Sequence, residues 1–198
     1  MMLGARTAAW SGKALPYLRR VAYLESSGTQ YIDFGVTPVF NDSFEIEYSI
    51  PYHFALNIAP FGCLNFTCVN QKKDQHPGNF YPRFFSTNAP TLNGYVYDPN
   101  YKYVINIENR IVTCLQDGVE FGTLNIGKYK ASGSLWCFGR SDTEAKANKI
   151  RCYRFKIRDI DTIPVLDLSG RPAMYDEVSG QFFYNQGTGE FTWGELTE

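Results

Sequence analysis

The chain has 198 residues and a mass of 22.5 kDa, a size at which an all-β sandwich commonly forms a single domain. Its formal net charge of −1 gives no general attraction for nucleic acid or an anionic membrane, so we expect neither as a partner. No apolar run approaches the roughly 18 residues of a membrane-spanning helix. An aromatic content of 16% argues against disorder and favours strands, so we expect a soluble, folded β protein.

Residues 1–20 differ in charge from the rest of the chain, because the first acidic residue is Glu25. Their basic residues are Arg6, Lys13, Arg19 and Arg20. The segment lacks the run of about 7 to 15 apolar residues that a secretory signal requires. It is either a frayed terminus or an arm that docks on a partner through Arg6 and Trp10, residue types that dominate binding interfaces. We expect a docking or assembly arm over 1–20 and one domain over 21–198.

Residues 44–50 alternate apolar and polar side chains, which is the period of a strand with one buried face. The side chains expected in the core are Phe44, Ile46, Tyr48 and Ile50. Glu45 and Glu47 are expected to face water. This stretch therefore predicts a strand in an antiparallel sheet that is exposed to solvent on one side.

The region from 57 to 100 contains five prolines among asparagines, glycines and aromatic residues. Proline donates no ladder hydrogen bond and is excluded from central strands, so we expect short strands separated by long loops. Two clusters in this region combine aromatic rings, amides and charge, which stack on sugar rings and bind their hydroxyls. The candidate binding residues are Tyr81, Arg83, Asn93, Tyr95, Tyr97 and Asp98. Core packing and a protein interface are the alternative roles of these clusters.

Three further strands are predicted at 101–107, 111–115 and 119–124, and Asp117-Gly118 supplies the positive φ of a tight hairpin between the last two. A short apolar strand follows at 134–139. Residues 141–149 carry a helix-capping pattern without an apolar face, and we expect a loop or a single turn there.

Residues 151–158 alternate once more. The side chains expected inside are Tyr153, Phe155 and Ile157, and those expected outside are Arg154, Lys156 and Arg158. Charged outer faces of this kind suit antiparallel sheets with one face exposed to solvent. Short strands separated by turns, without helices, predict an all-β fold, a two-sheet antiparallel β-sandwich or jelly roll.

The cysteines are odd in number and include no C-x-x-C pair that would indicate zinc. They are Cys63, Cys68, Cys114, Cys137 and Cys152. Four lie in apolar or aromatic surroundings, where a free thiol packs as a small hydrophobic group. We expect mainly reduced core residues made in a reducing cytosol, and a disulfide framework is the alternative.

Glu45 and Glu47 are considered as the carboxylate pair of a glycosidase. They lie two residues apart on one strand face, which places their carboxyl groups about 5 to 7 Å apart, and this distance is within reach of the pair in a retaining glycosidase. A solvated strand face produces the same spacing, and Ser49 follows where such a motif would continue with an acid. The two histidines, His53 and His76, accompany no nucleophile or phosphate-binding motif. We therefore expect no enzymatic activity.

Segments at both ends of the chain carry a family resemblance. The first is YLESSGTQYIDFGV at 23–36, and the second runs from 150–165 through GRPAMYDEVSGQFFYN at 170–185 to Phe191. They resemble the opening and closing segments of concanavalin A-like, laminin-G-like jelly-roll domains in phage and prophage structural proteins, especially of gut bacterial phages. GARTAAW at 4–10 resembles the start of such proteins. The resemblance implies this fold and a virion setting.

The residues of these two segments suit turns and hairpins that pair the beginning of the chain with its end. We accordingly expect an architectural role, and no ligand contact, for Asp33, Asp176 and Trp193. Laminin-G-like domains can bind calcium at the sandwich rim, which makes calcium the alternative to our expectation of no cofactor. The acids available for it are isolated: Asp74, Asp98, Asp142 and Asp161.

The hypothesis that follows is a non-enzymatic virion structural protein, made in the cytoplasm of a bacterial host. Its lectin-like domain would decorate a capsid or form part of a head or tail fibre, and would bind glycans of the host cell or of mucus. Residues 1–20 would attach it to other virion proteins, and symmetric packing of exposed aromatic side chains suits a homo-oligomer. The alternatives are a purely architectural assembly protein without a glycan ligand and a bacterial or prophage-borne adhesin.

Overall fold

The computed structural model describes eight segments of the chain, none of which contains a helix. They are residues 14–39, 41–51, 58–73, 76–81, 100–109, 111–125, 130–141 and 146–196. For residues 67–73, 76–81, 124 and 146 only the backbone is described. No described segment forms a helix long and apolar enough to cross a membrane.

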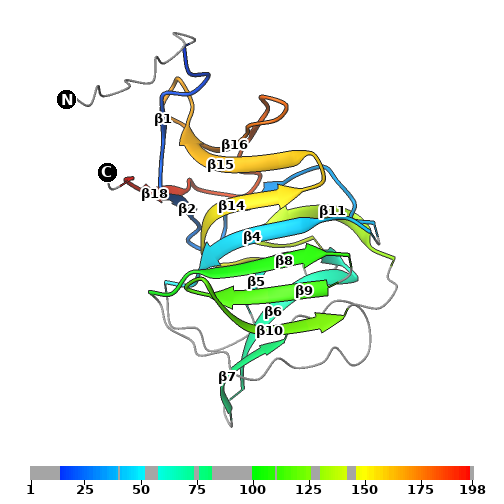
Figure 1. Ribbon diagram of the computed structural model, residues 1–198. Helices are drawn as coiled ribbons and strands as arrows, with labels where there is room; N and C mark the ends of the chain where they lie inside the picture. The colour runs from blue at the N-terminus through cyan, green and yellow to red at the C-terminus, as the bar shows by residue number, and fades with distance from the viewer. Residues whose placement is uncertain are drawn as a thin grey trace, which may run out of the picture.

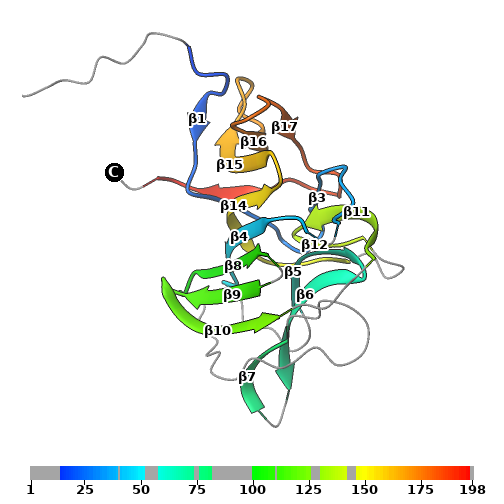
Figure 2. The same cartoon turned by 45° about the vertical axis from the view of Figure 1, so that its right-hand side comes forward.

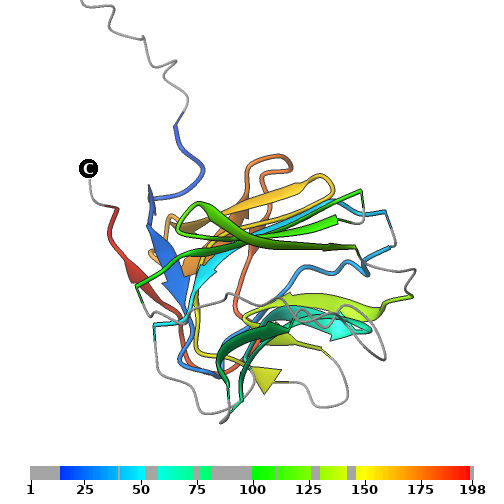
Figure 3. The same ribbon diagram turned by 60° about the horizontal axis from the view of Figure 1, so that its bottom comes forward.

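The strands form two antiparallel sheets that lie face to face, as Figure 3 shows. The large sheet has eleven strands, β1 (Arg19–Arg20), β2 (Tyr23–Glu25), β4 (Phe44–Ser49), β8 (Tyr103–Glu108), β9 (Ile111–Gln116), β10 (Val119–Asn125), β14 (Arg151–Ile157), β15 (Ile160–Leu166), β16 (Pro172–Asp176), β17 (Phe182–Phe183) and β18 (Thr192–Gly194). The small sheet has five, β3 (Ile32–Asp33), β5 (Ile58–Leu64), β6 (Phe66–Lys73), β7 (His76–Tyr81) and β11 (Ser132–Cys137). This confirms the predicted all-β, two-sheet antiparallel sandwich.

The order of strands follows chain order only in part. The large sheet runs β10-β9-β8-β4-β14-β15-β16-β17, with β2 also beside β14, β18 beside β2 and β1 beside β15. The small sheet runs β3-β11-β5-β6-β7, and β12 (Gly139–Arg140) pairs with β13 (Lys146–Ala147) in a separate ribbon. The β6–β7 hairpin extends beyond the body of the sandwich (Figure 2). Several neighbours in both sheets are therefore far apart in sequence.

Aromatic rings from both sheets meet in the core. Phe44 of β4 lies 4.3 Å from Phe61 of β5, measured between ring centroids, so this contact crosses from one sheet to the other. Phe34, just after β3, stacks on Phe155 of β14 with centroids 4.1 Å apart. Burial of large aromatic side chains is a major source of core stability. Within the described residues, aromatic side chains therefore supply much of the contact between the two layers.

The beginning and the end of the chain pair with each other, as predicted. Strand β18 runs antiparallel to β2, with Trp193 opposite Leu24, and Figure 1 shows the two strands side by side. A second contact follows, in which the amide of Thr188 donates to the carbonyl of Thr29 at 3.2 Å. The sandwich is thus closed by hydrogen bonds between segments about 160 residues apart.

Alternation and turn residues predicted the strands from 44 to 50 and from 101 to 124 correctly. The Asp117-Gly118 turn between β9 and β10 has φ values of 50° and 77°, the two positive values of a tight hairpin. Residues 146–147, inside the segment predicted as a loop or turn, form the short β13. The rest of that segment includes residues 142–145, which lie outside the described residues.

The prediction that Tyr153 faces the core is wrong. The register between β14 and β4 shifts between Cys152 and Arg154, which leaves Tyr153 as the extra residue of a β-bulge. A bulge reverses the side-chain alternation beyond it, so Cys152 is buried while the Tyr153 ring lies on the outer face. There the Tyr153 hydroxyl and the Ser49 hydroxyl share a hydrogen bond of 3.0 Å, and the Lys102 ammonium lies 4.3 Å from the ring centroid.

The sequence predicts short strands separated by long loops from 57 to 100. In the described part of that region, β5, β6 and β7 are six to eight residues long and thus longer than expected, while residues 82–99 lie outside the described residues. Strand β5 lies between β11 and β6 and nevertheless contains Pro60. The register between β5 and β6 shifts between Ile58 and Phe61, so Pro60 lies at a bulge, where the missing N–H breaks no regular ladder. Its carbonyl still accepts a hydrogen bond of 2.8 Å from the amide of Phe138.

Four of the cysteines are free and buried, which confirms the prediction for them: Cys63, Cys114, Cys137 and Cys152. The side chain of Cys68, in β6, lies outside the described residues. Burial raises the pKa of the Cys114 thiol to about 12, and the charge of Glu120 adds to this effect. A thiol with so high a pKa stays protonated and packs as an apolar group.

Candidate functional site

The loop residues predicted to bind a ligand fall largely outside the described residues. These are Arg83, Asn93, Tyr95, Tyr97 and Asp98. Tyr81 ends β7, where its backbone pairs with Val69 of β6, and its side chain is not described. The proposed role of all six therefore stays a prediction.

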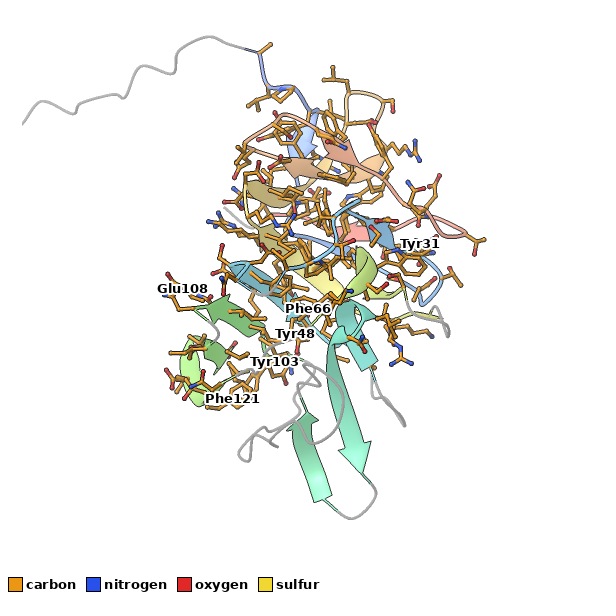
Figure 4. All side chains as sticks on the ribbon, turned by 90° about the vertical axis from the view of Figure 1, so that its right-hand side faces the viewer. Tyr31, Tyr48, Phe66, Tyr103, Glu108 and Phe121 are labelled. Atoms are coloured by element: carbon orange, nitrogen blue, oxygen red, sulfur yellow. The ribbon has the colours of Figure 1, made fainter. Side chains whose placement is uncertain are left out.

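The described residues contain a different candidate, on the outer face of the small sheet. In the register between β3 and β11, Trp136 lies opposite Asp33 and Cys137 lies opposite Ile32. Cys137 and Ile32 are buried in the core, so alternation turns Trp136 and Asp33 toward solvent. Tyr31, which directly precedes β3, lies at the margin of the molecule, away from the buried Tyr48 and Tyr103 (Figure 4).

Tyr31 and Trp136 form a stacked pair of rings. Their centroids are 3.8 Å apart and their planes differ by 17°. Both side chains are half-buried. On its other flank, Trp136 lies opposite Gly62 of β5, which contributes no side chain. We call Tyr31, Asp33 and Trp136 the aromatic platform.

Polar groups of the platform retain hydrogen-bonding capacity. One carboxylate oxygen of Asp33 accepts from the Gly35 amide at 2.8 Å and from the Ser134 hydroxyl. Within the described part of the chain, the other oxygen, the phenol of Tyr31 and the indole N–H of Trp136 have no hydrogen-bond partner. The expected architectural role of Asp33 is thus confirmed for one oxygen, and the second is available to a ligand.

The closing segment of the chain holds the platform in place. The amide of Tyr31 donates to the side-chain oxygen of Asn185 at 3.2 Å, and its carbonyl accepts from the amide of Gln186 at 2.9 Å. The same Asn185 oxygen accepts from the amide of Gly187 at 2.8 Å, while the Asn185 side-chain amide donates to Gly189 at 2.8 Å. The position of Tyr31 therefore depends on the contact between the two chain ends.

A platform of this kind suits an uncharged, ring-shaped ligand with hydroxyl groups. The C–H face of a sugar packs on an aromatic ring, while its hydroxyls donate to a carboxylate and exchange hydrogen bonds with a phenol or an indole N–H. The charge of Asp33 disfavours an anionic ligand at the same place. The rings and polar groups of the platform are thus of the kinds that contact neutral sugars.

The outer face of the large sheet carries charges that are already paired. Glu47 of β4 forms an ion pair of 3.0 Å with Lys102. Glu45 lies opposite Lys156 in the register between β4 and β14, where cross-strand opposite charges attract. The two glutamates thus occupy alternate positions in a mixed-charge surface, as the prediction of a solvated strand face requires.

Asp161, one of the candidate calcium ligands, is engaged with a cation. Arg154 donates to both of its oxygens, at 2.8 and 2.6 Å, and this hydrogen bonding lowers the pKa of Asp161 against the opposing effect of burial. Among the described residues, no three His, Cys, Asp or Glu side chains gather as metal ligands would. The other acids considered for calcium, Asp74, Asp98 and Asp142, lie outside the described residues.

Asp176 has the predicted architectural role. Its side chain is only 1% exposed, and it accepts hydrogen bonds from the amides of Asp161, Val178 and Ser179 and from the Ser179 hydroxyl. Burial alone would raise the pKa of Asp176, but these hydrogen bonds lower it. The carboxylate thus shapes the turn between β16 and β17 and joins it to β15.

Part of the predicted docking arm lies on the sandwich. Arg19 and Arg20 form β1, which pairs with β15, and Arg19 forms an exposed ion pair of 2.9 Å with Glu195. The amide of Leu18 donates to the carbonyl of Leu166. The remaining arm residues, Arg6, Trp10 and Lys13, lie outside the described residues. Their proposed contact with a partner stays a prediction.

Exposed apolar side chains lie around this base of the arm. Leu18, whose amide donates to Leu166, is 56% exposed. Leu168, two residues after Leu166, is 71% exposed. Leu196 follows Glu195, the partner of Arg19, and is 50% exposed. Exposed apolar side chains are a common feature of protein–protein interfaces.

Sequence reasoning missed the aromatic platform, although part of its signal was present. Alternation in residues 31–33 and 134–137 places Tyr31, Asp33 and Trp136 on outer faces. Which outer faces adjoin depends on the register between β3 and β11, whose residues are about 100 positions apart.

No protein-family model matches the chain, and no curated protein matches it.

Proposed function

We propose that this chain is a non-enzymatic structural protein of a bacteriophage particle whose β-sandwich binds a neutral glycan at the aromatic platform. The stacked Tyr31–Trp136 pair, with polar groups left for a ligand, is the observation that carries the glycan-binding part. The resemblance of residues 23–36 and 150–191 to phage structural proteins supports the virion setting. The glycan would belong to the host cell surface or to mucus.

A non-enzymatic role agrees with the surroundings of the carboxylates. Glu45 and Glu47, the pair considered for glycoside hydrolysis, face basic side chains across neighbouring strands. A retaining glycosidase needs one carboxylic acid with a raised pKa beside a carboxylate nucleophile. Asp33 of the platform is a single carboxylate that also orders a turn, so it suits binding better than hydrolysis.

The glycan-binding part is tested with the variant Trp136→Ala on a glycan array, followed by titration of the best ligand. We expect Kd to rise about tenfold or more, because truncating a central aromatic contact removes a large share of binding energy. Trp193→Ala is the matched control, since it removes a partly exposed tryptophan from the large sheet. The melting temperature of each variant verifies that it is folded.

Two results would contradict the platform as the glycan site. Trp136→Ala could bind as tightly as the unchanged chain while Tyr81→Ala binds more weakly, which would move the site to the predicted loop residues. Alternatively, the unchanged chain could bind no glycan on the array. That result would favour a purely architectural assembly protein.

Attachment to the particle is tested by deleting residues 1–13 from the gene in the phage genome. The deletion stops before Tyr17, whose ring packs on Tyr175 at 5.2 Å, so the sandwich keeps β1 and its contacts. We expect the shortened protein to have an unchanged melting temperature and to be missing from purified particles, as measured by immunoblot. Incorporation at the normal level would refute the proposed role of these residues.

An architectural assembly protein is the second candidate function. The exposed leucines at the base of the arm favour it, because they suit packing against a neighbouring virion protein or a second copy of this chain. The experiments above separate the two functions. An assembly protein without a glycan ligand depends on residues 1–13 and does not respond to Trp136→Ala.

A further inference from the structure

Two free thiols face each other between the sheets. Cys137 ends β11 in the small sheet, and Cys152 lies in β14 of the large sheet. Their sulfur atoms are 3.6 Å apart, and both side chains are fully buried. This contact brings one cysteine of each layer together only when the sandwich is folded.

The contact is close to the geometry of a disulfide. A disulfide has sulfur atoms about 2.05 Å apart and Cβ atoms about 3.5 to 4.5 Å apart, so the two Sγ atoms must approach by roughly 1.5 Å. Each cysteine has one rotatable side-chain bond to make that movement. The strands on either side are held in register with their neighbours, Cys137 opposite Ile32 and Cys152 opposite Leu24. The backbone therefore keeps the two thiols near each other without a covalent bond.

We propose that Cys137 and Cys152 form a disulfide that joins the two sheets when the protein meets a disulfide oxidant such as oxidised glutathione. One protein thiolate attacks the oxidant disulfide, forms a mixed disulfide and releases one glutathione thiol. The second protein thiolate then attacks the protein sulfur of the mixed disulfide and releases the second glutathione. The two cysteines lose two electrons and two protons, which the two glutathione thiols carry away.

Burial determines when this reaction takes place. Burial raises the pKa of Cys137, and the hydrogen bond and charge of Cys152 raise it further. A protonated, inaccessible thiol reacts slowly, because the thiolate is the attacking species. The disulfide therefore forms while the chain folds or transiently opens, and the folded, reduced protein resists oxidation at low temperature.

The bond would stabilise the sandwich. It closes a loop of about 15 residues and restricts the unfolded chain, an effect that corresponds to a melting temperature higher by roughly 5 to 10 °C in a protein of this size. The loop includes the β12–β13 ribbon. A covalent link between the layers would protect the protein outside a reducing cytosol, whether or not it binds a glycan or belongs to a virion.

The test compares full-length protein refolded in oxidised glutathione with protein refolded in a phosphine reductant. Trypsin cleaves after Lys130, Arg140, Arg151 and Arg154, so the disulfide would join ASGSLWCFGR to CYR. We expect this linked pair in the non-reducing mass spectrum of the oxidised sample and a higher melting temperature for that sample. The proposal would be overturned if the two peptides were free, or if either were linked to a different cysteine. It would also be overturned if the oxidised sample had a melting temperature equal to or lower than that of the reduced sample.

Two variants sharpen the comparison. Cys152→Ser should lose both the linked peptides and the difference in melting temperature between the oxidised and reduced samples. Cys114→Ala removes another buried thiol and should retain both. Loss of both in Cys114→Ala would overturn the pairing. If Cys152→Ser does not fold, comparing the linked peptides and the melting temperature of the unchanged protein in the two buffers still tests the proposal.

Discussion

Replacing Gly187 by alanine is expected to lower the free energy of unfolding by about 3 kcal/mol or more, because overpacked sites must distort. A Cβ atom on Gly187 would overlap the Thr29 carbonyl oxygen and lie only 3.0 Å from the carbonyl carbon. Both are backbone atoms, which cannot rotate away as a side-chain tip can. Urea unfolding followed by tryptophan fluorescence measures the loss.

The matched control for Gly187→Ala is Gly170→Ala. Gly170 has a φ of +85° but no atom within 4 Å of the added Cβ, so only the left-handed backbone is penalised, at about 1 kcal/mol. Gly187→Ala should also weaken ligand binding at the platform, because Gly187 and Tyr31 share the Asn185 oxygen. Equal costs for the two variants would show that the chain ends are not closely packed.

Phe155→Ala is expected to lower the free energy of unfolding by about 3 to 5 kcal/mol, the cost of removing a large aromatic side chain from a packed core. Phe155 is fully buried, stacks on Phe34 at 4.1 Å and meets Phe44 edge-on at 5.2 Å. Its removal would leave a cavity between the two layers, since the surrounding strands are fixed by their hydrogen bonds. Urea unfolding measures this loss as well.

Phe182→Ala is the control for Phe155→Ala. Phe182 is half-buried on the outer face of the large sheet, in a small cluster with Tyr175 and Tyr184. Partial burial limits the expected loss to roughly 1 to 2 kcal/mol. A cost for Phe155→Ala no greater than that for Phe182→Ala would mean that the contact of Phe155 with Phe34 and Phe44 does not form the centre of the core.

Local patterns predicted most strands well because the period of a strand is set by its own residues. The alternation from Phe44 to Ile50 identified the buried face of β4, and Asp117-Gly118 identified the β9–β10 turn. The same reasoning misplaced Tyr153, since an extra residue in one strand is defined only by the register with its partner. Pro60 was misjudged for the same reason, because a bulge removes the ladder position at which proline is excluded.

The candidate site depended still more on register. Tyr31 and Trp136 are adjacent because β3 pairs with β11, and Cys137 meets Cys152 because the two sheets pack at that point. A sequence pattern states that a residue points outward or inward, but it does not state which residue of another strand lies beside it.

The sequence by itself determined the all-β class, the faces of the regular strands, the tight turn at Asp117-Gly118 and the pairing of the chain's beginning with its end. These follow from short-range periodicity, from backbone preferences of particular residues and from the two end segments. The tertiary structure alone decided the bulges at Tyr153 and Pro60, the aromatic platform and the facing thiols. Each of those depends on contacts between distant segments, whose register is set by packing of the whole core.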